Sequence, residues 1–517
     1  MTGLWWREAV TYEIYLRSYA DGTGDGLGDL PGARSRLEYP RDLGVDAVWL
    51  TPFYPSPDHD AGYDVLDHRA VDSRFGTLAD VHGLLAEAHA LGLRVVVDLV
   101  LNHVSAGHPW FRAARAAGPG SAERHRFHVR PGRGPAGERP PTNWPSIFGG
   151  PAWSPFGDGE WYLHLFDAQQ PDLRHDHPEV AADAEATLRF WLDRGVDGVR
   201  FDAAGSLVKD AEYPDLPAGW RSGDPAPYSD RDGVHAIYRR WARVLARYPG
   251  DRLGVAETWG GPEVLGPYLR PDELGQAFAM DPLFWPLDAA TWRVGVDALL
   301  AATLRHGRLP TWVHGSHDVR RAASRWGAGG SRAVLLLMLA LPGSVYLYAG
   351  DELGLPEVEL PDDAIRDPVF RRSGGADRGR DGARVPLPWT DGPPPYGFAP
   401  PRVEPWLPQP DGWGGYAVDR QAADPASTLA LTRAALRLRT AEWRGRPAEL
   451  CWLAGSDGGG HGPDGVLAFR RGPDGPVCLA NLGDRPVPWR RYGDRVLLAS
   501  APLSDGWLPP RCTAWLR

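Results

Sequence analysis

Charged side chains stand at the ends of several strand-like segments of this chain. In Gly198-Val-Arg-Phe-Asp202, Arg200 and Asp202 are two positions apart, and residues two apart in a strand share a face. Taken alone, such a pair also fits a buried structural ion pair. Similar groups follow other apolar segments: Asp98 with Asn102 and His103, Glu257 alone, and His317 with Asp318.

Three carboxylates gathered at one place would repel one another unless one keeps its proton or a cation lies near. Cleavage of a glycosidic bond uses such a set, because one carboxylate attacks the sugar carbon while a protonated carboxyl group donates to the leaving oxygen. We expect Arg200 to lower the pKa of Asp202, and the neighbouring carboxylates to raise that of Glu257. A metal hydrolase would need a pattern such as H-E-x-x-H, which the sequence lacks.

These groups can meet only if the segments between them bring the strand ends together. Strand-like and helix-like segments alternate, which predicts a parallel sheet. Eight strand positions can be counted, as in a closed (β/α)8 TIM barrel, where the carboxyl ends of the strands converge on one face. We place them at residues 9–15, 47–50, 93–103, 198–202, 253–257, 277–280, 311–313 and 344–349. Helices are predicted at residues 33–44, 78–91, 180–194, 234–247, 287–304 and 427–440, with another ending at 341.

The alternation is interrupted between Val104 and His177, where Gly and Pro accumulate and helical periodicity is lost. We predict an insertion domain at 104–177, after the third strand, that forms one wall of a pocket. It divides the catalytic barrel domain into 1–103 and 178–440. The tail, 441–517, consists of short β segments between turns and predicts a C-terminal antiparallel β domain.

The composition argues against some classes of binding partner. The net charge of the 517 residues is −10 and no Lys/Arg-rich run occurs, which argues against nucleic acid or an anionic membrane surface. The longest apolar run, 333–341, ends at Pro342, short of a membrane span. No secretory signal is recognisable at the start, and the three cysteines, Cys451, Cys478 and Cys512, are scattered, so we expect a cytoplasmic protein.

A glycine-rich loop, residues 21–29, has an oxygen-bearing side chain at almost every second position. Hard cations such as Ca²⁺ or Mg²⁺ prefer such ligands. Position twelve of an EF-hand loop would be Glu, but here it is Gly32. The loop is therefore either a cation site of another kind or an Asx/Gly turn without an ion; we expect an ion that is structural, not catalytic.

Four segments resemble the conserved regions of the α-amylase superfamily, glycoside hydrolase family 13. They are Asp98-Leu-Val-Leu-Asn102-His103, Arg200-Phe-Asp202, Ala256-Glu257-Thr-Trp and His317-Asp318. Gln170-Pro-Asp-Leu173 is similar to the insertion-domain motif of the α-glucosidase and oligo-1,6-glucosidase branch. The resemblance runs in order from about Trp5 to the final domain.

The resemblance implies a role for each matched residue. Asp202 is the implied nucleophile and Glu257 the general acid/base, with retention of configuration, while Asp318 holds the sugar hydroxyls. The implied substrate contacts are His103 and His317 as hydrogen-bond partners, Arg200 orienting the nucleophile, Tyr63 stacking on the ring, Asp60 and Arg384 pairing to close the subsite, and Phe166 and Gln170 lining the mouth. The implied cation ligands are Asp21, Thr23, Asp25, the Leu27 carbonyl and Asp29.

Some positions have a second interpretation or depart from the family pattern. Asp98 and Asn102 also fit a role in fixing the loop under His103, and Tyr63 fits an ordinary core position. Ser316, Thr23 and Arg174 stand where the family commonly has Asn; Ser316 would loosen His317 and Thr23 would weaken or alter the ion. Ala203 follows the nucleophile, where a small residue favours α-1,4 and valine α-1,6 cleavage.

The leading hypothesis is an exo-acting retaining α-glucosidase that releases terminal α-1,4-linked glucose from short malto-oligosaccharides. An α-glucosyl transferase and an oligo-1,6-glucosidase of the same family are the alternatives within the enzyme class. A non-catalytic sugar- or protein-binding relative is the third, although such proteins typically lose a carboxylate that this chain keeps. The expected partner is a small oligosaccharide, with no nucleic acid and no membrane.

Overall fold

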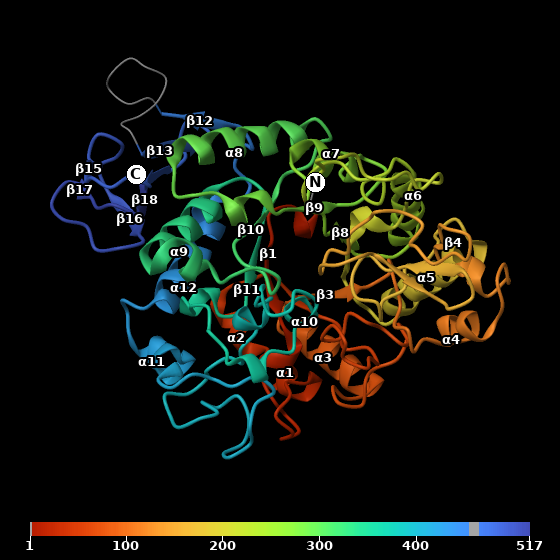
Figure 1. Cartoon of the computed structure of the whole chain (residues 1–517). Helices are drawn as coiled ribbons and strands as arrows, with labels where there is room; N and C mark the ends of the chain where they lie inside the picture. Colours follow the sequence, from red (N-terminus) through yellow and green to blue (C-terminus); the bar gives the residue numbers. More distant parts are fainter. Residues whose placement is uncertain (1–2, 454–464) are drawn as a thin grey trace.

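The computed structural model describes residues 3–453 and 465–517. Eight parallel strands close a barrel in the order β1-β11-β10-β9-β8-β7-β3-β2 (Figure 1), which confirms the predicted TIM barrel. The strands are β1 Val10–Ile14, β2 Ala47–Leu50, β3 Arg94–Leu99, β7 Gly198–Phe201, β8 Leu253–Ala256, β9 Gln276–Ala279, β10 Thr311–Val313 and β11 Ser344–Tyr348. Most lie within a residue or two of their predicted positions, because strands covered on both faces read as continuous apolar runs. The exception is β3, which ends at Leu99, before the end of the run predicted at 93–103.

Large side chains fill the barrel and its register aligns the strand ends. Trp49, Val96, Val255, Phe278 and Tyr346 belong to one buried cluster inside it. The pairing of β3 with β7 sets Asp98 opposite Arg200, and that of β7 with β8 sets Phe201 opposite Ala256. The residues that follow these strands therefore emerge at one level on the carboxyl face.

Helices cover the outside of the barrel (Figure 1). They are α1 Leu30–Ser35, α2 Glu38–Leu43, α3 Leu78–Ala90, α5 Pro178–Leu192, α6 Gly233–Leu245, α7 Pro262–Tyr268, α8 Ala289–Leu304, α9 Ala322–Ala340 and α12 Thr428–Leu438. Two short helices, α10 Pro368–Arg372 and α11 Val418–Ala423, belong to the long segment between β11 and α12. The single helix predicted at 33–44 is two short ones, because Pro40 has no N–H to donate to the preceding turn. No helix was predicted where α7 lies, since Pro262 and Pro267 obscure its pattern.

A small sheet lies between β3 and α5, on the right of Figure 1, and the buried cluster beside it also includes Leu216 and Tyr228 from the segment after β7. Its strands β4 Val129–Pro131, β5 Trp153–Pro155 and β6 Glu160–Leu163 pair in the order β4-β6-β5. Trp144, Trp153 and Leu163 form part of its buried cluster. Helix α4 Pro109–Ala116 also lies here, where we predicted no helix.

The last part of the chain forms an antiparallel sheet in the order β12-β13-β14-β18-β16. Its strands are β12 Leu450–Trp452, β13 Val466–Arg471, β14 Val477–Asn481, β16 Val496–Ala499 and β18 Cys512–Leu516, beside the pair β15 Val487–Pro488 and β17 Trp507–Leu508. The sheet packs on α9, where the Trp515 indole donates to the Leu336 carbonyl at 3.2 Å. The prediction of a C-terminal β unit is thus confirmed, while residues 454–464 of it lie outside the described part.

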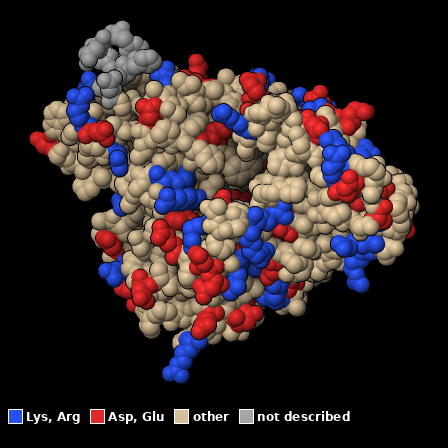
Figure 2. Space-filling view, viewed as in Figure 1, with Lys and Arg blue, Asp and Glu red and all other residues tan. Residues whose placement is uncertain are grey.

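Across the described ranges, none of the helices combines the length and the apolar character needed to cross a bilayer. Acidic and basic side chains are interspersed over the face of the molecule drawn in Figure 2.

Candidate active site

Asp202 and Glu257 follow neighbouring barrel strands and contact the same guanidinium. Arg200 Nη1 donates to Asp202 Oδ1 at 2.8 Å, and Arg200 Nη2 lies 3.7 Å from Glu257 Oε2. The backbone N–H of Ala203 donates to Glu257 Oε2 at 2.6 Å, and the Trp259 indole donates to Oε1. Two carboxyl groups from different strands are therefore held at one point.

The protonation of this pair differs from our expectation at Asp202. Burial raises the pKa of Glu257 to about 7, and the charges of Asp202 and Asp318 act in the same direction. Burial also raises the pKa of Asp202 to about 7, although Arg200 opposes it. Arg200 lowers this pKa, as predicted, but the lost solvation of Asp202 and the charge of Asp98 outweigh the guanidinium, so the net pKa is raised instead of lowered.

The pair of Asp202 and Glu257 can still supply one ionised and one protonated carboxyl group, although both pKa values are raised. Coupled groups release their protons in separate steps, so near neutral pH the pair holds one proton. Arg200 lies closer to Asp202 than to Glu257, which favours the anion at Asp202 and the proton at Glu257. This is one carboxylate beside one carboxylic acid, as a retaining glycosidase needs.

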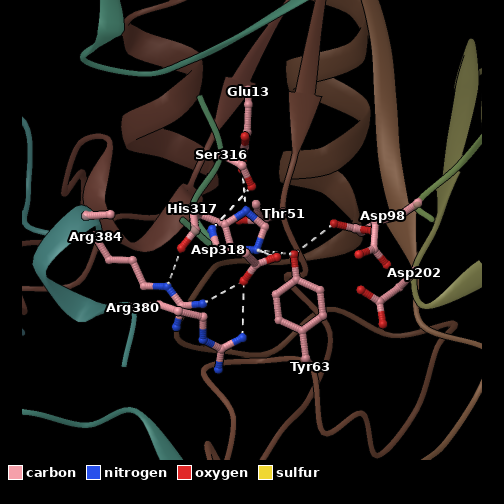
Figure 3. A network of polar contacts seen from close by, with 12 residues as sticks. Glu13, Thr51, Tyr63, Asp98, Asp202, Ser316, His317, Asp318, Arg380 and Arg384 are labelled. Atoms are coloured by element: carbon pink, nitrogen blue, oxygen red, sulfur yellow. Dashed lines mark hydrogen bonds and ion pairs between the residues drawn. The ribbon is translucent and has the colours of Figure 1, made fainter. Parts of the chain in front are cut away.

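Asp318, which follows β10, is held as an anion by two arginines (Figure 3). Arg380 Nη1 and Arg384 Nη2 both contact its Oδ1, at 3.1 and 3.0 Å. Burial opposes ionisation, but the neighbouring His317, Arg380 and Arg384 outweigh it and hold the pKa of Asp318 well below its usual range.

The partner of Asp60 is Arg380, and the predicted pair of Asp60 with Arg384 was wrong. Arg380 Nη2 donates to Asp60 Oδ1 at 2.7 Å, while its Nε is anchored to Asp367 at 2.7 Å. Arg384 instead donates from Nε to the His317 carbonyl at 3.0 Å. Arg380 therefore joins Asp60 to Asp318 on one side of the site.

His103 and Gln170 lie together beneath this contact. The Gln170 amide donates to Asp60 Oδ2 at 3.0 Å and lies 3.2 Å from His103 Nε2. Gln170 is fully buried, so the prediction that it lines the mouth was wrong. Phe166 is half-buried, with its ring centroid 5.1 Å from that of His103. Burial lowers the pKa of His103 to about 4, so its imidazole is neutral at pH 7.

Tyr63 connects Asp98, beside the Asp202–Glu257 pair, with His317, beside Asp318. Its hydroxyl donates to Asp98 Oδ2 at 3.0 Å and lies 2.9 Å from His317 Nε2, and its ring stacks on that of His317 (Figure 3). Asp98 Oδ1 accepts from Arg200 at 2.6 Å. The expectation that Asp98 fixes the loop under His103 was wrong; Asn102 does so, with its amide 3.2 Å from His103 Nδ1.

Three residues of the site were not recognised from the sequence. Arg380 has the same side chain as Arg384 in one irregular loop, and only the fold distinguishes them. Glu13 was overlooked inside β1, although an acid in a strand buried throughout is a signal. Lys209 is the only lysine of the chain, and its ammonium pairs with Asp172 at 2.7 Å and donates to Asn102 at 2.8 Å.

Ser316 does not loosen His317, contrary to our expectation. Its hydroxyl accepts from the Asp318 backbone N–H at 3.2 Å, while both ring nitrogens of His317 have partners. Arg174 pairs with Asp176 and contacts none of the carboxylates above.

The glycine-rich loop uses its carboxylates internally. Asp21 accepts from the backbone N–H groups of Thr23, Gly24 and Gly26, and Asp29 from those of Gly22, Thr23 and Gly32. The Thr23 hydroxyl donates to Asp29 at 2.8 Å, and Asp25 accepts from the Leu27 N–H. Within residues 3–453 and 465–517, no three His, Cys, Asp or Glu side chains are grouped like metal ligands. These contacts fit the Asx/Gly-turn alternative directly, and the ion stays a prediction.

Comparison with known proteins decides the family. The family model described as "Alpha amylase, catalytic domain" matches residues 13–444. The chain belongs to the α-amylase family of glycoside hydrolases. It is therefore a glycoside hydrolase, and its relatives lie in the α-glucosidase and oligo-1,6-glucosidase branch.

Three relatives illustrate the range of this family. A probable α-glucosidase of Rhizobium meliloti (strain 1021) is 38% identical over 468 residues, 84% of this chain and 83% of that protein. An oligo-1,6-glucosidase of Heyndrickxia coagulans is 33% identical over 479 residues, 84% of this chain and 85% of that protein. The crystal structure of an α-glucosyl transfer enzyme, XgtA, matches with a TM-score of 0.86 and 34% identity, covering 100% of both chains.

Proposed function

We propose that the chain is an exo-acting, retaining α-glucosidase that releases glucose from the non-reducing ends of short malto-oligosaccharides. The supporting observation is the contact of Asp202 and Glu257 with one guanidinium, that of Arg200. A retaining mechanism needs two close carboxyl groups, whereas an inverting enzyme keeps them far enough apart for a water molecule. Asp202 is then the nucleophile and Glu257 the acid/base.

Exo action is supported by the closed side of the site. Asp60 and Asp318 are joined through Arg380, and Gln170 joins Asp60 to His103. A terminal glucose bound against these side chains would have them on the side where a further ring would have to lie, and this favours exo action. His103, His317 and Tyr63 are the proposed contacts to that terminal glucose.

The test of this function compares Asp202→Asn with Asp363→Asn, which changes an exposed carboxylate. We expect Asp202→Asn to lose turnover of maltose by orders of magnitude with an unchanged unfolding temperature. The Asp363 variant should match the unmodified protein. Undiminished turnover in Asp202→Asn refutes the assignment of the nucleophile.

The α-1,4 preference rests on the small side chain of Ala203, and an oligo-1,6-glucosidase is the alternative. A panel of α-linked disaccharides with glucose release as the readout distinguishes them. Faster cleavage of isomaltose than of maltose would favour the alternative.

Transfer to a sugar or alcohol acceptor is a second candidate, favoured by two exposed aromatic side chains. Trp259 is 47% exposed and donates to the acid/base, and Phe284 is 66% exposed with its ring centroid 6.3 Å from that of Trp259. Sugars stack on such faces, so an acceptor bound here would compete with water for the glucosyl-enzyme. If this is so, Phe284→Ala lowers the share of transfer products from concentrated maltose and leaves hydrolysis of dilute maltose unchanged. An unaltered product ratio would contradict the acceptor role.

The proposed location is the cytoplasm, supported by Cys451, Cys478 and Cys512 being free thiols. Cell fractionation tests it.

A further inference from the structure

Glu13 is a buried carboxyl group to which the catalytic scheme above gives no role. It lies in β1, is 1% exposed, and contacts Nδ1 of His317 through Oε1 (Figure 3). In the part of the chain that the structure describes, no Lys or Arg nitrogen pairs with it. Beyond this contact, burial and the charges of Asp318 and Asp98 raise its pKa, and the charge of Arg200 lowers it.

The second ring nitrogen of His317 faces two groups that accept hydrogen bonds. Nε2 lies 2.9 Å from the Tyr63 hydroxyl and 3.4 Å from Asp318 Oδ2. The Tyr63 proton is used toward Asp98, so its oxygen is free to accept. Asp318 is an anion between Arg380 and Arg384. Both neighbours therefore require a hydrogen on Nε2.

With a hydrogen on Nε2, Nδ1 is either a bare acceptor or the second N–H of an imidazolium. An imidazolium would be buried, with a side-chain exposure of 1%, and near the cations Arg384, Arg200 and Arg380. Burial lowers the pKa of His317 well below its usual range, and burial with the charge of Asp318 raises that of Glu13. Both directions favour a neutral ring and a protonated Glu13.

The imidazole ring of His317 is held in place by two aromatic neighbours. Tyr15 stacks on His317 with ring centroids 5.2 Å apart and Tyr63 stacks on it at 5.5 Å, with interplanar angles of 26° and 15°. A ring stacked with two others cannot turn to exchange its nitrogens without moving them. The tautomer is then the remaining variable.

We propose that Glu13 is a positioning residue, which donates its carboxylic O–H to Nδ1 of His317 and so fixes the tautomer that carries hydrogen on Nε2. The meaning of this for the sugar rests on the proposed function: the one hydrogen on Nε2 points at Tyr63 and Asp318, and a hydroxyl oxygen of the terminal glucose bound beside them would share it, where the other tautomer would offer only a lone pair. The same Nε2–H starts the hydrogen-bond chain through Tyr63 and Asp98 to Arg200.

Two variants separate a donor at position 13 from a negative charge there. Glu13→Gln keeps a donor that cannot ionise, whereas Glu13→Met has a similar length and no donor. We expect Glu13→Met to lose about 10- to 100-fold in kcat/KM for maltose, the usual effect of an unmade buried hydrogen bond, and Glu13→Gln to recover most of it. Equal losses in both variants would show that a donor at position 13 does not suffice, and no loss in Glu13→Met would show that the contact has no role. Either result overturns the proposal.

The tautomer is measured directly by ¹⁵N NMR on the full chain labelled with ¹⁵N-histidine, using His317→Asn to assign the signals. The proposal predicts a bare Nδ1 and a protonated Nε2. A protonated Nδ1 overturns it, whether Nε2 is protonated or not. This readout needs neither turnover nor a stable position-13 variant, so it fails or succeeds independently of the glucosidase assignment.

Discussion

Ala203 and Glu257 are joined across two barrel strands, with the Ala203 backbone N–H donating to Glu257 Oε2 at 2.6 Å. Ala203 follows Asp202 directly and has a left-handed backbone conformation, with φ of 47°. That conformation aims its N–H at the neighbouring strand end. The position after the nucleophile thus also orients the acid/base.

A β-branched side chain at this position should disturb both carboxyl groups. Valine strains a left-handed backbone by about 1–2 kcal/mol, so we expect Ala203→Val to turn the N–H away from Glu257. The pKa of Glu257 then rises further, because this hydrogen bond lowers it. With maltose as substrate, the alkaline limb of the pH–rate profile moves to higher pH as activity falls. Ala203→Gly, which tolerates the conformation, is the control. An unchanged pH profile in Ala203→Val would argue against the contact.

We expect Arg380 to be important for activity, although it lies in a loop, because it pairs with three carboxylates. Arg380→Gln leaves Asp60, Asp318 and Asp367 without their shared cation. The pKa of Asp60, already raised by burial to about 6, rises again, so the group takes up a proton near neutral pH. We expect kcat/KM to fall about 100-fold or more and the acid limb of the profile to move to higher pH. Arg378→Gln, which removes an exposed ion pair in the same loop, should have neither effect.

Lys209 should connect the insertion to the barrel. Its side chain and that of Asp172 are both 0% exposed, so Lys209→Met leaves a buried carboxylate unpaired. We expect a loss of about 3–5 kcal/mol in the free energy of unfolding, measured by chemical denaturation. The double variant Lys209→Met/Asp172→Asn should be more stable than Lys209→Met alone. A single variant as stable as the unmodified protein would show that this pair is not needed.

The 21–29 loop offers a test of the predicted structural ion. If Asp21, Asp25 and Asp29 hold Ca²⁺ or Mg²⁺, a chelator lowers the melting temperature and the purified protein contains the ion by elemental analysis. The internal hydrogen bonds of Asp21 and Asp29 suffice for a turn without one. Unchanged melting temperature and no bound ion would establish the turn.

The sequence predicts the barrel well because its strands are buried on both faces. The run at 93–103 is an example: it needs no tertiary information to be recognised. The acids after the strands could be located for the same reason. Their partners could not, because the contact of Asp98 with Arg200 depends on the register of β3 and β7. The choice between Arg380 and Arg384 depends on a loop without periodicity.

Protonation was the hardest property to predict. At Asp202 the sequence indicates the neighbouring charge of Arg200, but the loss of water around the carboxylate is a property of the folded site and is the larger effect. The same holds for Glu13 and His317. The proton between them can be assigned only when the hydrogen-bond partners of both imidazole nitrogens are known.

The anomer of glucose first released from maltose tests the central claim most directly. If Asp202 forms a covalent glucosyl-enzyme and Glu257 then activates water, configuration is retained, and ¹H NMR at early times shows α-glucose from the non-reducing unit before mutarotation. Initial release of β-glucose would mean a single displacement by water, and would contradict the roles given to both carboxyl groups.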